Sequence, residues 1–469
     1  PGEGRAMKVL FLAAEATPYV KVGGLGDVAG ALPQALRRLG IDVKLMLPRY
    51  GSIDPGRYAM TVAMHDFPVY MDWRQERCQL WAANNTDFFV ENSHFFGSRS
   101  SAYGHDDDPE RFVLFARAAL EACRLSGWHP DVIHAHDWHS AAAIRLQWSA
   151  PNRAGLVFTI HNMAHQGLCS NNNWPLLGVY DAHGNLNLME QAIYAADVVT
   201  TVSPTYAHEI QRREYGFGLD GLLRQRDQRL VGIVNGIDTE IWNPATDPIL
   251  PARFDRHHLE GKRKCKMELQ RRQGLRVDPD APLIGVVSRL DDQMGIRLIV
   301  ESLGDLWAFS NAQFMVLGSG HDAYENAFRS ASHYHGDRMA NWIGFNNEMS
   351  HLVYAASDIF LMPSNFEPCG ISQMIAMRYG GLPVVRSTGG LVDTVPDRSQ
   401  PDGVGYRFDN YDKGAMLHAL SRALRDYYDK PAWNQAMQRA MTRDFSWGTS
   451  ARRYAEVYKW SCQLAHRHL

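Results

Sequence analysis

The sequence predicts an α/β protein made of two doubly wound domains, and three features of the chain carry this prediction. With 469 residues, the chain is longer than one hydrophobic core normally serves, so two domains of roughly 200 residues each are expected. Short apolar runs typical of strands alternate with helical stretches, which is the pattern of parallel sheets covered by helices. A proline-rich segment at residues 241–254 separates two such series.

The first series begins with a buried-strand candidate at residues 7–13, a glycine-rich turn at 21–27 and a helix at 28–39. Further strand-like runs follow at residues 42–48, 131–136, 155–161, 197–202 and 231–234. The second series has its strand-like runs at residues 282–290, 314–320, 358–364 and 382–388. In both series the apolar runs are short and bounded by turn residues, as expected for strands buried on both faces of a sheet.

These patterns predict an N-terminal domain over residues 1–245 and a C-terminal domain over residues 246–446. The amphipathic stretch 447–469 is expected to form a helix that crosses back to the first domain. The basic run GKRKCKMELQRR, residues 261–272, would open the second domain as a helix. We expect its charged residues to form a solvated face, because apolar positions interrupt them and the net charge of the chain is −3.

Composition narrows the function classes. Hydrophobic residues make up 45% and charged residues 21% of the chain, which is typical of a globular protein, and the negative net charge indicates no nucleic-acid partner. No apolar run approaches the roughly 18 residues of a membrane span. The six cysteines contain no CxxC pair, which predicts reduced thiols and a cytoplasmic protein. The segment PGEGRA before Met7 resembles a cloning remnant or the cut end of a longer protein, so a plastid location after removal of a transit peptide stays open.

The first motif, KVGGLGDV at residues 21–28, follows the first predicted strand. Gly23, Gly24 and Gly26 allow the backbone to approach a ligand and offer amide donors to it. Lys21 could place a positive charge near a phosphate, and Asp27 could accept hydrogen bonds from hydroxyl groups. A plain turn between a strand and a helix explains the same residues equally well.

The second motif, HAHDWHS at residues 134–140, has the residue types of a metal site. The apolar residues Val132 and Ile133 come directly before it, so we expect His134 and His136 to be buried and hydrogen bonded at a strand end, with no metal.

Side chains just after predicted strands are candidates for ligand binding, because the carboxyl ends of parallel strands meet at one edge of a doubly wound sheet. Asp137 and Trp138 follow one strand and could contact a sugar. His161 ends the next strand in TIHNMAHQG. A structural role explains it too, but its place at the strand end favours a function.

The most specific motif is SNFEPCGISQ, residues 364–373. A strand leads to Glu367, and the amides of Cys369, Gly370 and Ile371 begin a helix, so donors and the positive helix end could bind phosphate oxygens beside a carboxylate. The segment TGGLVDTV, residues 388–395, repeats the arrangement. Two such helix starts in one domain predict a diphosphate ligand.

Together these motifs resemble the family of bacterial glycogen synthases and plant starch synthases, which are retaining glycosyltransferases of GT-B architecture. The resemblance runs from AAEATPYVKVGGLGDVAGALP to DFSWGTSARRYAEVY and so covers nearly the whole chain. It includes TVSPTYAHEI, GFGLDGLL, GIVNGIDTEIWNPATD and FEPCG in the order of the family. The combination of KVGGLGDV, NGIDTEIWNP and FEPCG is far more specific than any single glycine motif.

The resemblance implies two Rossmann-like domains that face a deep interdomain cleft. It implies transfer of glucose from ADP-glucose, or UDP-glucose, to the non-reducing end of an α-1,4-glucan with retention of the anomeric configuration. ADP-glucose is the favoured donor, the nucleotide-sugar is a co-substrate, and neither a metal nor another cofactor is expected. The oligomeric state stays open.

Position within the motifs also implies roles for individual residues. The implied catalytic residues are His161, Arg289 and Glu367. The implied donor-binding residues are Lys21, Gly23, Gly24, Phe345, Cys369, Gly370, Ile371, Thr388, Gly389 and Gly390. The acceptor and sugar side would comprise Glu15, Asp27, Asp137, Trp138 and Asn235. In this assignment Arg289 stabilises the departing diphosphate, Glu367 holds glucose hydroxyls without acting as a nucleophile, and Phe345 stacks on the base.

The chain departs from the family pattern at three positions. Family members have a lysine five residues after the arginine of the SRL motif, where this chain has Met294. Asn365 replaces an arginine and Gly381 replaces a threonine. A hydrogen bond from a cation to phosphate contributes about 1.5–3 kcal/mol, so losing the lysine is the most serious change.

Three explanations of Met294 stay open at this stage: a weak or specialised synthase, a catalytically impaired paralogue that binds glucan or nucleotide as a regulatory or scaffold partner, and an engineered variant. A rival of another class is a phosphorylase-like enzyme of the same architecture. It would need a pyridoxal cofactor bound to a lysine, which no motif here supports.

Overall fold

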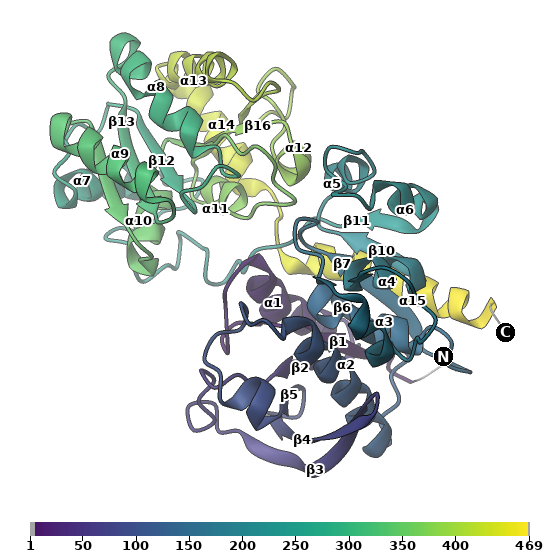
Figure 1. Ribbon diagram of the computed structural model, residues 1–469. Coiled ribbons are helices and arrows are strands. Elements are labelled where there is room, and N and C mark those ends of the chain that lie inside the picture. The colour runs from purple at the N-terminus through teal and green to yellow at the C-terminus, as the bar shows by residue number, and fades with distance from the viewer. Residues whose placement is uncertain (1–4, 468–469) are drawn as a thin grey trace. The chain divides into compact units, whose positions relative to one another are not determined.

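A computed structural model describes residues 5–467 and divides into two compact units (Figure 1). Unit 1 comprises Pro1–Ile233 and Trp447–Leu469, and unit 2 comprises Val234–Ser446. The sequence placed the boundary between residues 245 and 246, whereas the structure divides the chain between Ile233 and Val234. The difference arises because the proline-rich segment packs on unit 2.

Unit 1 is built on a nine-stranded sheet with the order β11-β10-β7-β6-β1-β2-β5-β4-β3. Its strands are β1 Lys8–Leu12, β2 Asp42–Pro48, β3 Thr61–Met71, β4 Arg74–Ala82, β5 Asp87–Glu91, β6 Val132–His136, β7 Gly155–Ile160, β10 Val198–Thr201 and β11 Leu230–Gly232. Seven of these strands run parallel, while β4 lies antiparallel to both β3 and β5. The sequence patterns did not predict β3, β4 or β5. Leu168–Cys169 (β8) and Leu186–Asn187 (β9) form a separate two-stranded ladder.

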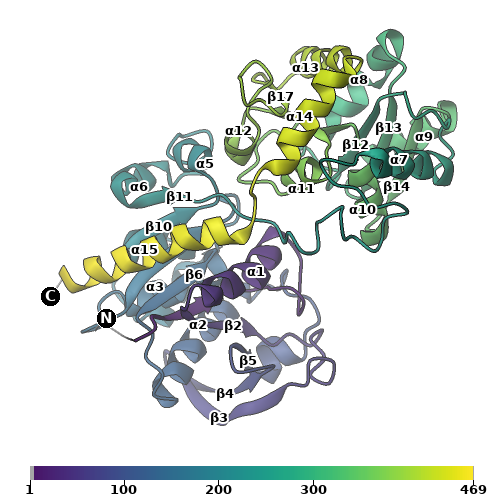
Figure 2. The same cartoon turned by 180° about the vertical axis from the view of Figure 1, so that it is seen from behind.

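Helices cover both faces of this sheet. The helices are α1 Gly24–Arg38, α2 Asp108–Leu125, α3 Trp138–Gln147, α4 Leu188–Ala195, α5 Pro204–Glu209, α6 Asp220–Gln225 and α15 Trp447–Arg467, with shorter helical turns at Ser93–Gly97, Asn171–Leu177 and Asp227–Arg229. Helices α2, α3 and α4 pack in sequence on one face, and α1 and α15 lie side by side on the other (Figures 1 and 2). Unit 1 is therefore doubly wound, as predicted.

The C-terminal helix α15 belongs to unit 1 although unit 2 precedes it in the chain. It packs on β7 and beside α1 (Figure 2). The approach is close: a Cβ built at Gly155 would lie 2.5 Å from Ser461 Oγ. The Tyr458 hydroxyl lies 2.8 Å from His134 Nδ1, so the last helix reaches the buried histidines of β6.

Unit 2 is built on a six-stranded parallel sheet with the order β14-β13-β12-β15-β16-β17. Its strands are β12 Leu283–Val287, β13 Gln313–Gly318, β14 Met339–Ile343, β15 Ile359–Met362, β16 Leu382–Arg386 and β17 Tyr406–Phe408. Its helices are α7 Glu260–Arg272, α8 Ile296–Phe309, α9 Asp322–Tyr334, α10 Asn347–Ala356, α11 Ser372–Arg378, α12 Gly389–Thr394, α13 Lys413–Tyr427 and α14 Lys430–Thr442. Helix α8 pairs with α13, and α7 pairs with α10, so this unit is doubly wound as well (Figure 1).

The segment between β11 and α7 packs against unit 2 as an ordered part of it. Trp242 stacks on His351 with ring centroids 4.1 Å apart. The buried Asp247 carboxylate lies 2.7 Å from His351 Nδ1 and accepts a hydrogen bond of 2.6 Å from the Tyr379 hydroxyl. Because a buried carboxylate needs such partners, these contacts fix the segment to α10 and to the end of α11.

Helix α7 is present where the sequence predicted it, but the expected solvated face is wrong for two of its lysines. Lys262 and Lys266 are 5% and 3% exposed. The Lys262 ammonium donates to the carbonyls of Ala355, Ser357 and Tyr379 at 2.8–2.9 Å, which lie at the ends of α10 and α11. Carbonyl groups at the end of a helix have no partner within that helix, so they need donors from elsewhere. Lys262, on the buried face of α7, supplies such a donor.

Replacing Lys262 by methionine should destabilise unit 2 by about 2–3 kcal/mol, because three buried carbonyls would lose a charged donor at once. Burial lowers the pKa of Lys262 to about 8, so the removed desolvation penalty offsets part of the loss. The measurement is guanidinium unfolding followed by tryptophan fluorescence. Lys264→Met, on the exposed face of the same helix, is the matched control and should leave the transition in place. Equal midpoints for both variants would contradict the capping role.

No helix within residues 5–467 is long and apolar enough to span a bilayer. All six cysteines are free thiols, and five of them are buried.

Candidate active site

In unit 1, three predicted site residues lie at the same edge of the sheet. Glu15 comes after β1, Asp137 directly follows β6, and His161 directly follows β7. Strands β1, β6 and β7 are consecutive in the sheet, and the connections leave β1 and β6 in opposite directions. This is the topological switch point, where doubly wound sheets bind their ligands.

Glu15 organises the glycine-rich loop. Its side chain is 3% exposed. Oε2 accepts hydrogen bonds from the Val22 amide and, at 2.9 Å, from the Gly23 amide, and Oε1 accepts one of 3.2 Å from the Tyr103 hydroxyl. The two bonds from Val22 and Gly23 hold the loop that leads into α1, and the assignment of Glu15 to the acceptor side stays a prediction.

Helix α1 begins at Gly24, four residues earlier than predicted, with Gly23 as its N-terminal cap residue. Gly23 has no side chain that could cap the helix, and a Cβ built on Gly24 would meet no atom within 4 Å. The early start places backbone amides and the positive end of the helix dipole beside Lys21. The Gly23 amide already donates to Glu15, so of the three residues predicted to meet phosphate, Lys21 and Gly24 stay candidates for binding an anion.

Lys21 and Asp27 form an ion pair in this structure. Lys21 Nζ lies 2.7 Å from Asp27 Oδ1, and half of the lysine side chain is exposed. The lysine therefore remains accessible to a phosphate, and binding one would compete with or extend its contact to Asp27.

Asp137 holds an unusual backbone conformation at the start of α3, with φ 55° and ψ 178°. Residues other than glycine rarely adopt this region, at a cost of order 1–3 kcal/mol. The conformation aims Oδ1 at the His161 amide, 2.8 Å away, while the Asp137 amide donates to the Thr159 carbonyl. Burial raises the pKa of Asp137 to about 7, and the amides of His161 and Asn162 oppose that rise.

His161 contacts a second histidine from the neighbouring strand. His161 Nε2 lies 2.9 Å from His136 Nδ1. Burial lowers the pKa of His161 to about 3, so its ring is neutral at physiological pH. Within residues 5–467 no cluster of His, Cys, Asp or Glu side chains is arranged to hold a metal ion.

Trp138 packs within unit 1 and is only partly exposed. Gly167 has φ +65°, and a Cβ on it would lie 2.4 Å from the indole ring of Trp138. The indole also contacts Phe112 and His139. These contacts support a structural role, and the exposed part of the ring stays a candidate for a sugar contact.

In unit 2, Arg289 and Glu367 flank the switch point between β12 and β15. Arg289 follows β12, and Glu367 follows β15, its neighbour in the sheet. Arg289 Nη1 is paired with Asp291 Oδ2 at 2.6 Å. Burial raises the pKa of Glu367 to about 7, while the nearby Arg289 charge and the Gly370 amide lower it.

The FEPCG loop is held by contacts of its own backbone. Gly370 has φ +70°, and a Cβ on it would lie 2.6 Å from Gln373 Oε1. The backbone N–H of Asn235 donates to the sulfur of Cys369, which lowers the pKa of that thiol against the effect of burial, so the predicted residue Asn235 lies against this loop. Helix α11 begins at Ser372, with Ile371 as its cap residue. The Ile371 end of this short helix faces the same sheet edge as Glu367.

The second glycine pair is packed on the FEPCG loop, which revises one expectation. A Cβ at Gly389 would lie 1.8 Å from the Glu367 carbonyl oxygen, and one at Gly390 would lie 2.2 Å from the Cys369 carbonyl oxygen. The Gly390 amide donates to the carbonyls of Glu367 and Pro368 at 3.1 and 3.2 Å. This amide is therefore engaged with the protein backbone, and the glycines are required for close packing. Thr388 is also buried, at 1% exposed.

Phe345 is 86% exposed, in the loop between β14 and α10. An aromatic ring left this exposed at the ligand-binding edge of a sheet is available to stack on a base. Stacking of Phe345 on a base therefore stays a prediction.

Met294 lies close to Arg289 in the loop before α8. Its sulfur is 4.0 Å from Arg289 Nη2, and its amide donates to Asp291 Oδ1 at 3.0 Å. At the position where the resemblance implies a lysine, an apolar group thus lies beside Arg289, which the sequence placed at the diphosphate and which is already paired with an acid.

The other two departures from the family pattern, Asn365 and Gly381, lie at opposite edges of the sheet of unit 2. Asn365 is exposed at the end of β15, where its amide donates to the Gln293 carbonyl and its own carbonyl accepts from Arg386. Gly381 lies just before β16, at the opposite edge of the sheet from Glu367. A Cβ on Gly381 would meet its nearest neighbours at 3.3–3.4 Å, so the lost threonine concerns packing and not the site.

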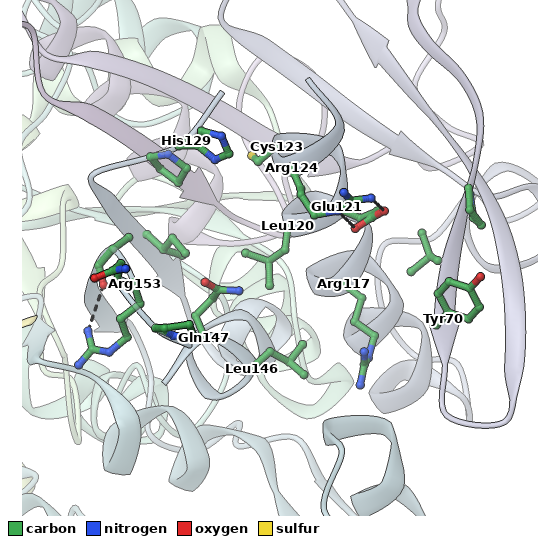
Figure 3. Close-up of a pocket in the computed structure, with 17 residues that line it drawn as sticks. Tyr70, Arg117, Leu120, Glu121, Cys123, Arg124, His129, Leu146, Gln147 and Arg153 are labelled. Atoms are coloured by element: carbon green, nitrogen blue, oxygen red, sulfur yellow. Dashed lines mark hydrogen bonds and ion pairs between the residues drawn. The ribbon is translucent and has the colours of Figure 1, made fainter. Parts of the chain in front are cut away.

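A hollow of about 470 Å³ lies elsewhere in unit 1 (Figure 3). It is lined by residues that include Arg117 and Glu121 of α2, Gln147 at the end of α3, and Tyr70 of β3. Its lining includes Pro130 and Ala154, which precede β6 and β7, so it opens at the other edge of the sheet from His161. None of the predicted site residues lines it.

Three neighbours of the predicted residues were missed by sequence reasoning. Tyr103 reaches Glu15 across 88 residues, and no local motif marks it. His136 was predicted to be buried, but its contact with His161 requires the register of β6 against β7. Asp291 stands two positions after Arg289, so the charge pattern itself could have indicated the pair.

Two protein-family models match this chain. Residues 8–225 match the family model described as starch synthase catalytic domain, and residues 268–440 match that of group 1 glycosyl transferases. A glycogen synthase of Anaeromyxobacter sp. (strain Fw109-5) is 45% identical over 97% of this chain and 99% of its own. A glycogen synthase of Clostridium novyi (strain NT) is 42% identical over 96% of this chain and 98% of its own.

Two solved structures are similar to this chain over nearly its whole length. The catalytic domain of starch synthase IV from Arabidopsis thaliana has a TM-score of 0.90 and 36% identity, covering 98% of this chain and all of that one. A sucrose-phosphate synthase from Thermosynechococcus elongatus has a TM-score of 0.64 at 16% identity over 97% of this chain and 98% of its own, which shows the fold alone. The predicted GT-B fold class of two Rossmann-like domains is confirmed.

Proposed function

The chain belongs to the family of bacterial glycogen synthases and plant starch synthases, and from that premise we propose that it transfers glucose from a nucleotide-sugar to the non-reducing end of an α-1,4-glucan, with retention. The observation that carries the proposal is the 45% identity to a glycogen synthase over almost the full length of both chains. The switch points carry Asp137 and His161 in unit 1 and Arg289 and Glu367 in unit 2, although Met294 stands where the resemblance implies a second cation.

The proposed donor is ADP-glucose, with UDP-glucose as the alternative. The structurally similar starch synthase IV was solved with ADP and acarbose bound. In this chain the exposed ring of Phe345 supports stacking on a nucleobase.

The chemistry proposed for unit 2 is electrostatic. Breaking the bond between glucose and the diphosphate places negative charge on the leaving oxygens, and fixed donors near them lower the barrier. Arg289 supplies a cation, and amides at the start of α11 supply dipoles. Glu367 follows the neighbouring strand, and its carboxylate would accept hydrogen bonds from glucose hydroxyls when ionised.

In unit 1, the proposed work is positioning. Glu15 fixes the glycine-rich loop, so that Lys21 and the first amides of α1 can meet an anion. Asp137 fixes the His161 backbone. The reaction proposed here uses no metal or resident cofactor. The free thiols support the proposed cytoplasmic location.

The test is a chain-elongation assay with the purified protein, ADP-glucose and maltoheptaose, with UDP-glucose in a parallel reaction. Longer oligosaccharides and released ADP, with the new bonds cleaved by an α-1,4-specific glucosidase, are the expected result. Binding of ADP-glucose without any elongation from either donor would overturn the proposal in favour of a non-catalytic binding protein.

A further inference from the structure

A chain of three histidine rings crosses the centre of unit 1. His134 and His136 stand two residues apart on β6 and so lie on the same face of the strand, where their ring centroids are 4.0 Å apart. His136 then contacts His161 at the end of β7, where the two nitrogen atoms are 2.9 Å apart. The three rings therefore connect the sheet interior with the edge that carries the predicted site residues.

The ring nitrogens of the three histidines differ in whether they have a hydrogen-bond partner. Both nitrogens of His134 have hydroxyl partners, from Tyr458 and Thr159 at 2.8 and 2.6 Å. Nε2 of His136 is buried and has no hydrogen-bond partner among the described residues. Nδ1 of His161 has no hydrogen-bond partner among the described residues either, but the His161 side chain is partly exposed at the strand end, where a ligand or water can reach it.

Burial disfavours the charged form of both His136 and His161, so each ring carries one proton. Only one of the two facing nitrogens can hold a proton, since their contact is a single N–H···N hydrogen bond. If His136 were protonated at Nε2, an N–H group would be buried without an acceptor, and orphaned buried N–H groups are rare in native proteins. The proton of His136 therefore belongs on Nδ1, where it is donated to His161 Nε2.

The hydrogen bond from His136 also determines the tautomer of His161. Because His161 Nε2 accepts a hydrogen bond, it has no proton, and the proton of the neutral ring is on Nδ1. His161 thus offers an N–H donor at the strand end, and the bond from His136 removes its lone pair from any role as a base.

We propose that His136 is a positioning residue that fixes the tautomer of His161, so that His161 donates an Nδ1–H hydrogen bond to an oxygen of the bound sugar. This rests on the proposed function for the identity of the ligand, although the tautomer itself does not. His136 touches no substrate in this proposal and acts through His161 alone.

Three variants of His136 separate its hydrogen bond from its bulk. His136→Asn keeps a donor near the place of Nδ1, His136→Leu removes it, and His136→Asp leaves only an acceptor, which forces a proton onto His161 Nε2. His139→Asn is the matched control, because His139 is another buried histidine of unit 1 outside the ring chain.

The first readout is the nitrogen-15 shift pattern of the imidazole of His161, recorded by long-range proton–nitrogen correlation in histidine-labelled protein. The chain has 20 histidines, so the His161 signals are identified by their loss in His161→Asn. The expected pattern is Nδ1–H in the original protein, in His136→Asn and in His139→Asn, and Nε2–H or a doubly protonated ring in His136→Asp. An Nε2–H pattern in the original protein overturns the proposal.

The second readout is elongation kinetics. We expect His136→Asn to keep kcat within about threefold, and His136→Asp and His136→Leu to lower kcat by about 10²-fold, as for loss of one preorganised donor. Loss in His136→Asn equal to that in His136→Leu would show that bulk and not the donor matters, and would overturn the proposal. An Nδ1–H pattern in a protein that never elongates glucan would instead leave the tautomer assignment standing and refute the proposed function.

Discussion

Replacing Met294 by lysine should raise the rate of glucan elongation at least tenfold. Arg289 is the cation that the sequence placed at the departing diphosphate, and its Nη1 is paired with Asp291 Oδ2 at 2.6 Å. The Met294 sulfur lies 4.0 Å from the same guanidinium, so a lysine here would add a second positive charge close to it.

The size of this effect follows from where the charge develops. A cation that meets a leaving diphosphate in a site shielded from water typically changes the rate by about 10²–10³-fold. Part of this gain is offset, because a lysine beside Arg289 is repelled by it until the diphosphate binds. We therefore expect a rise between about tenfold and 10³-fold, chiefly in kcat, since the charge on the leaving oxygens is largest in the transition state.

Initial rates with ADP-glucose and maltoheptaose measure the effect. Met294→Gln is the matched control, because glutamine has a similar length and no charge, and it should stay within about threefold of the original rate. If lysine and glutamine give equal rates, the missing charge does not limit catalysis. The same two variants, each combined with Asn365→Arg, would then show whether the absence of an arginine at position 365 limits catalysis.

Replacing Glu367 by glutamine should lower kcat/KM by about 10²–10³-fold. The carboxylate stands after β15 at the switch point, and we propose that it accepts hydrogen bonds from glucose hydroxyls. Charged acceptors bind hydroxyl groups roughly twice as strongly as neutral ones, and an amide also presents a donor where an acceptor is needed. The loss should appear in kcat as well as KM, because a misplaced glucose ring reacts poorly.

The pH dependence of kcat/KM, compared between the original protein and Glu367→Gln, tests whether Glu367 is the titrating group. Burial raises its pKa to about 7, so at pH 6 about nine tenths of the free protein would carry the protonated, inactive form. Because the ionised form is the acceptor, kcat/KM should rise with pH through about 7 and level off above it. Asp137, whose pKa burial also raises to about 7, titrates in the same range. The assignment therefore depends on Glu367→Gln losing the rise.

Glu348→Gln serves as the control for this experiment. Glu348 is an exposed glutamate of unit 2 at the start of α10, and its removal should leave both the rate and the pH profile unchanged. A profile for Glu367→Gln that still rises through pH 7 would assign the titration to another group, with Asp137 the first to test.

The sequence alone determined the class of fold and the edge at which the site lies. Runs such as LIGVV and GLVFTI are short and contain at most one polar residue, which is typical of strands buried on both faces, so the parallel sheets follow from local pattern. Glu15, His161, Arg289 and Glu367 come just after such runs. Chain order therefore placed them at the carboxyl edges without any knowledge of packing.

Strands with a mixed pattern escaped prediction. In β3 the burial alternates irregularly, and its register against β4 shifts twice, so the simple period of two is lost. Similarly, the lysines of α7 read as a solvated face, because charge is normally left in water. Only packing brought the carbonyl ends of α10 and α11 to Lys262.

Tertiary structure alone decided which groups touch within the candidate site. Tyr103 meets Glu15 from 88 residues away, and His136 meets His161 because β6 pairs with β7 in one particular register. Hydrogen bonds of this kind depend on distances of a few tenths of an ångström between segments far apart in the chain, and the spacing of residue types carries no such information. Local pattern thus specified which residues reach the edge of each sheet, whereas long-range packing specified the proton, charge and backbone geometry that each of them presents there.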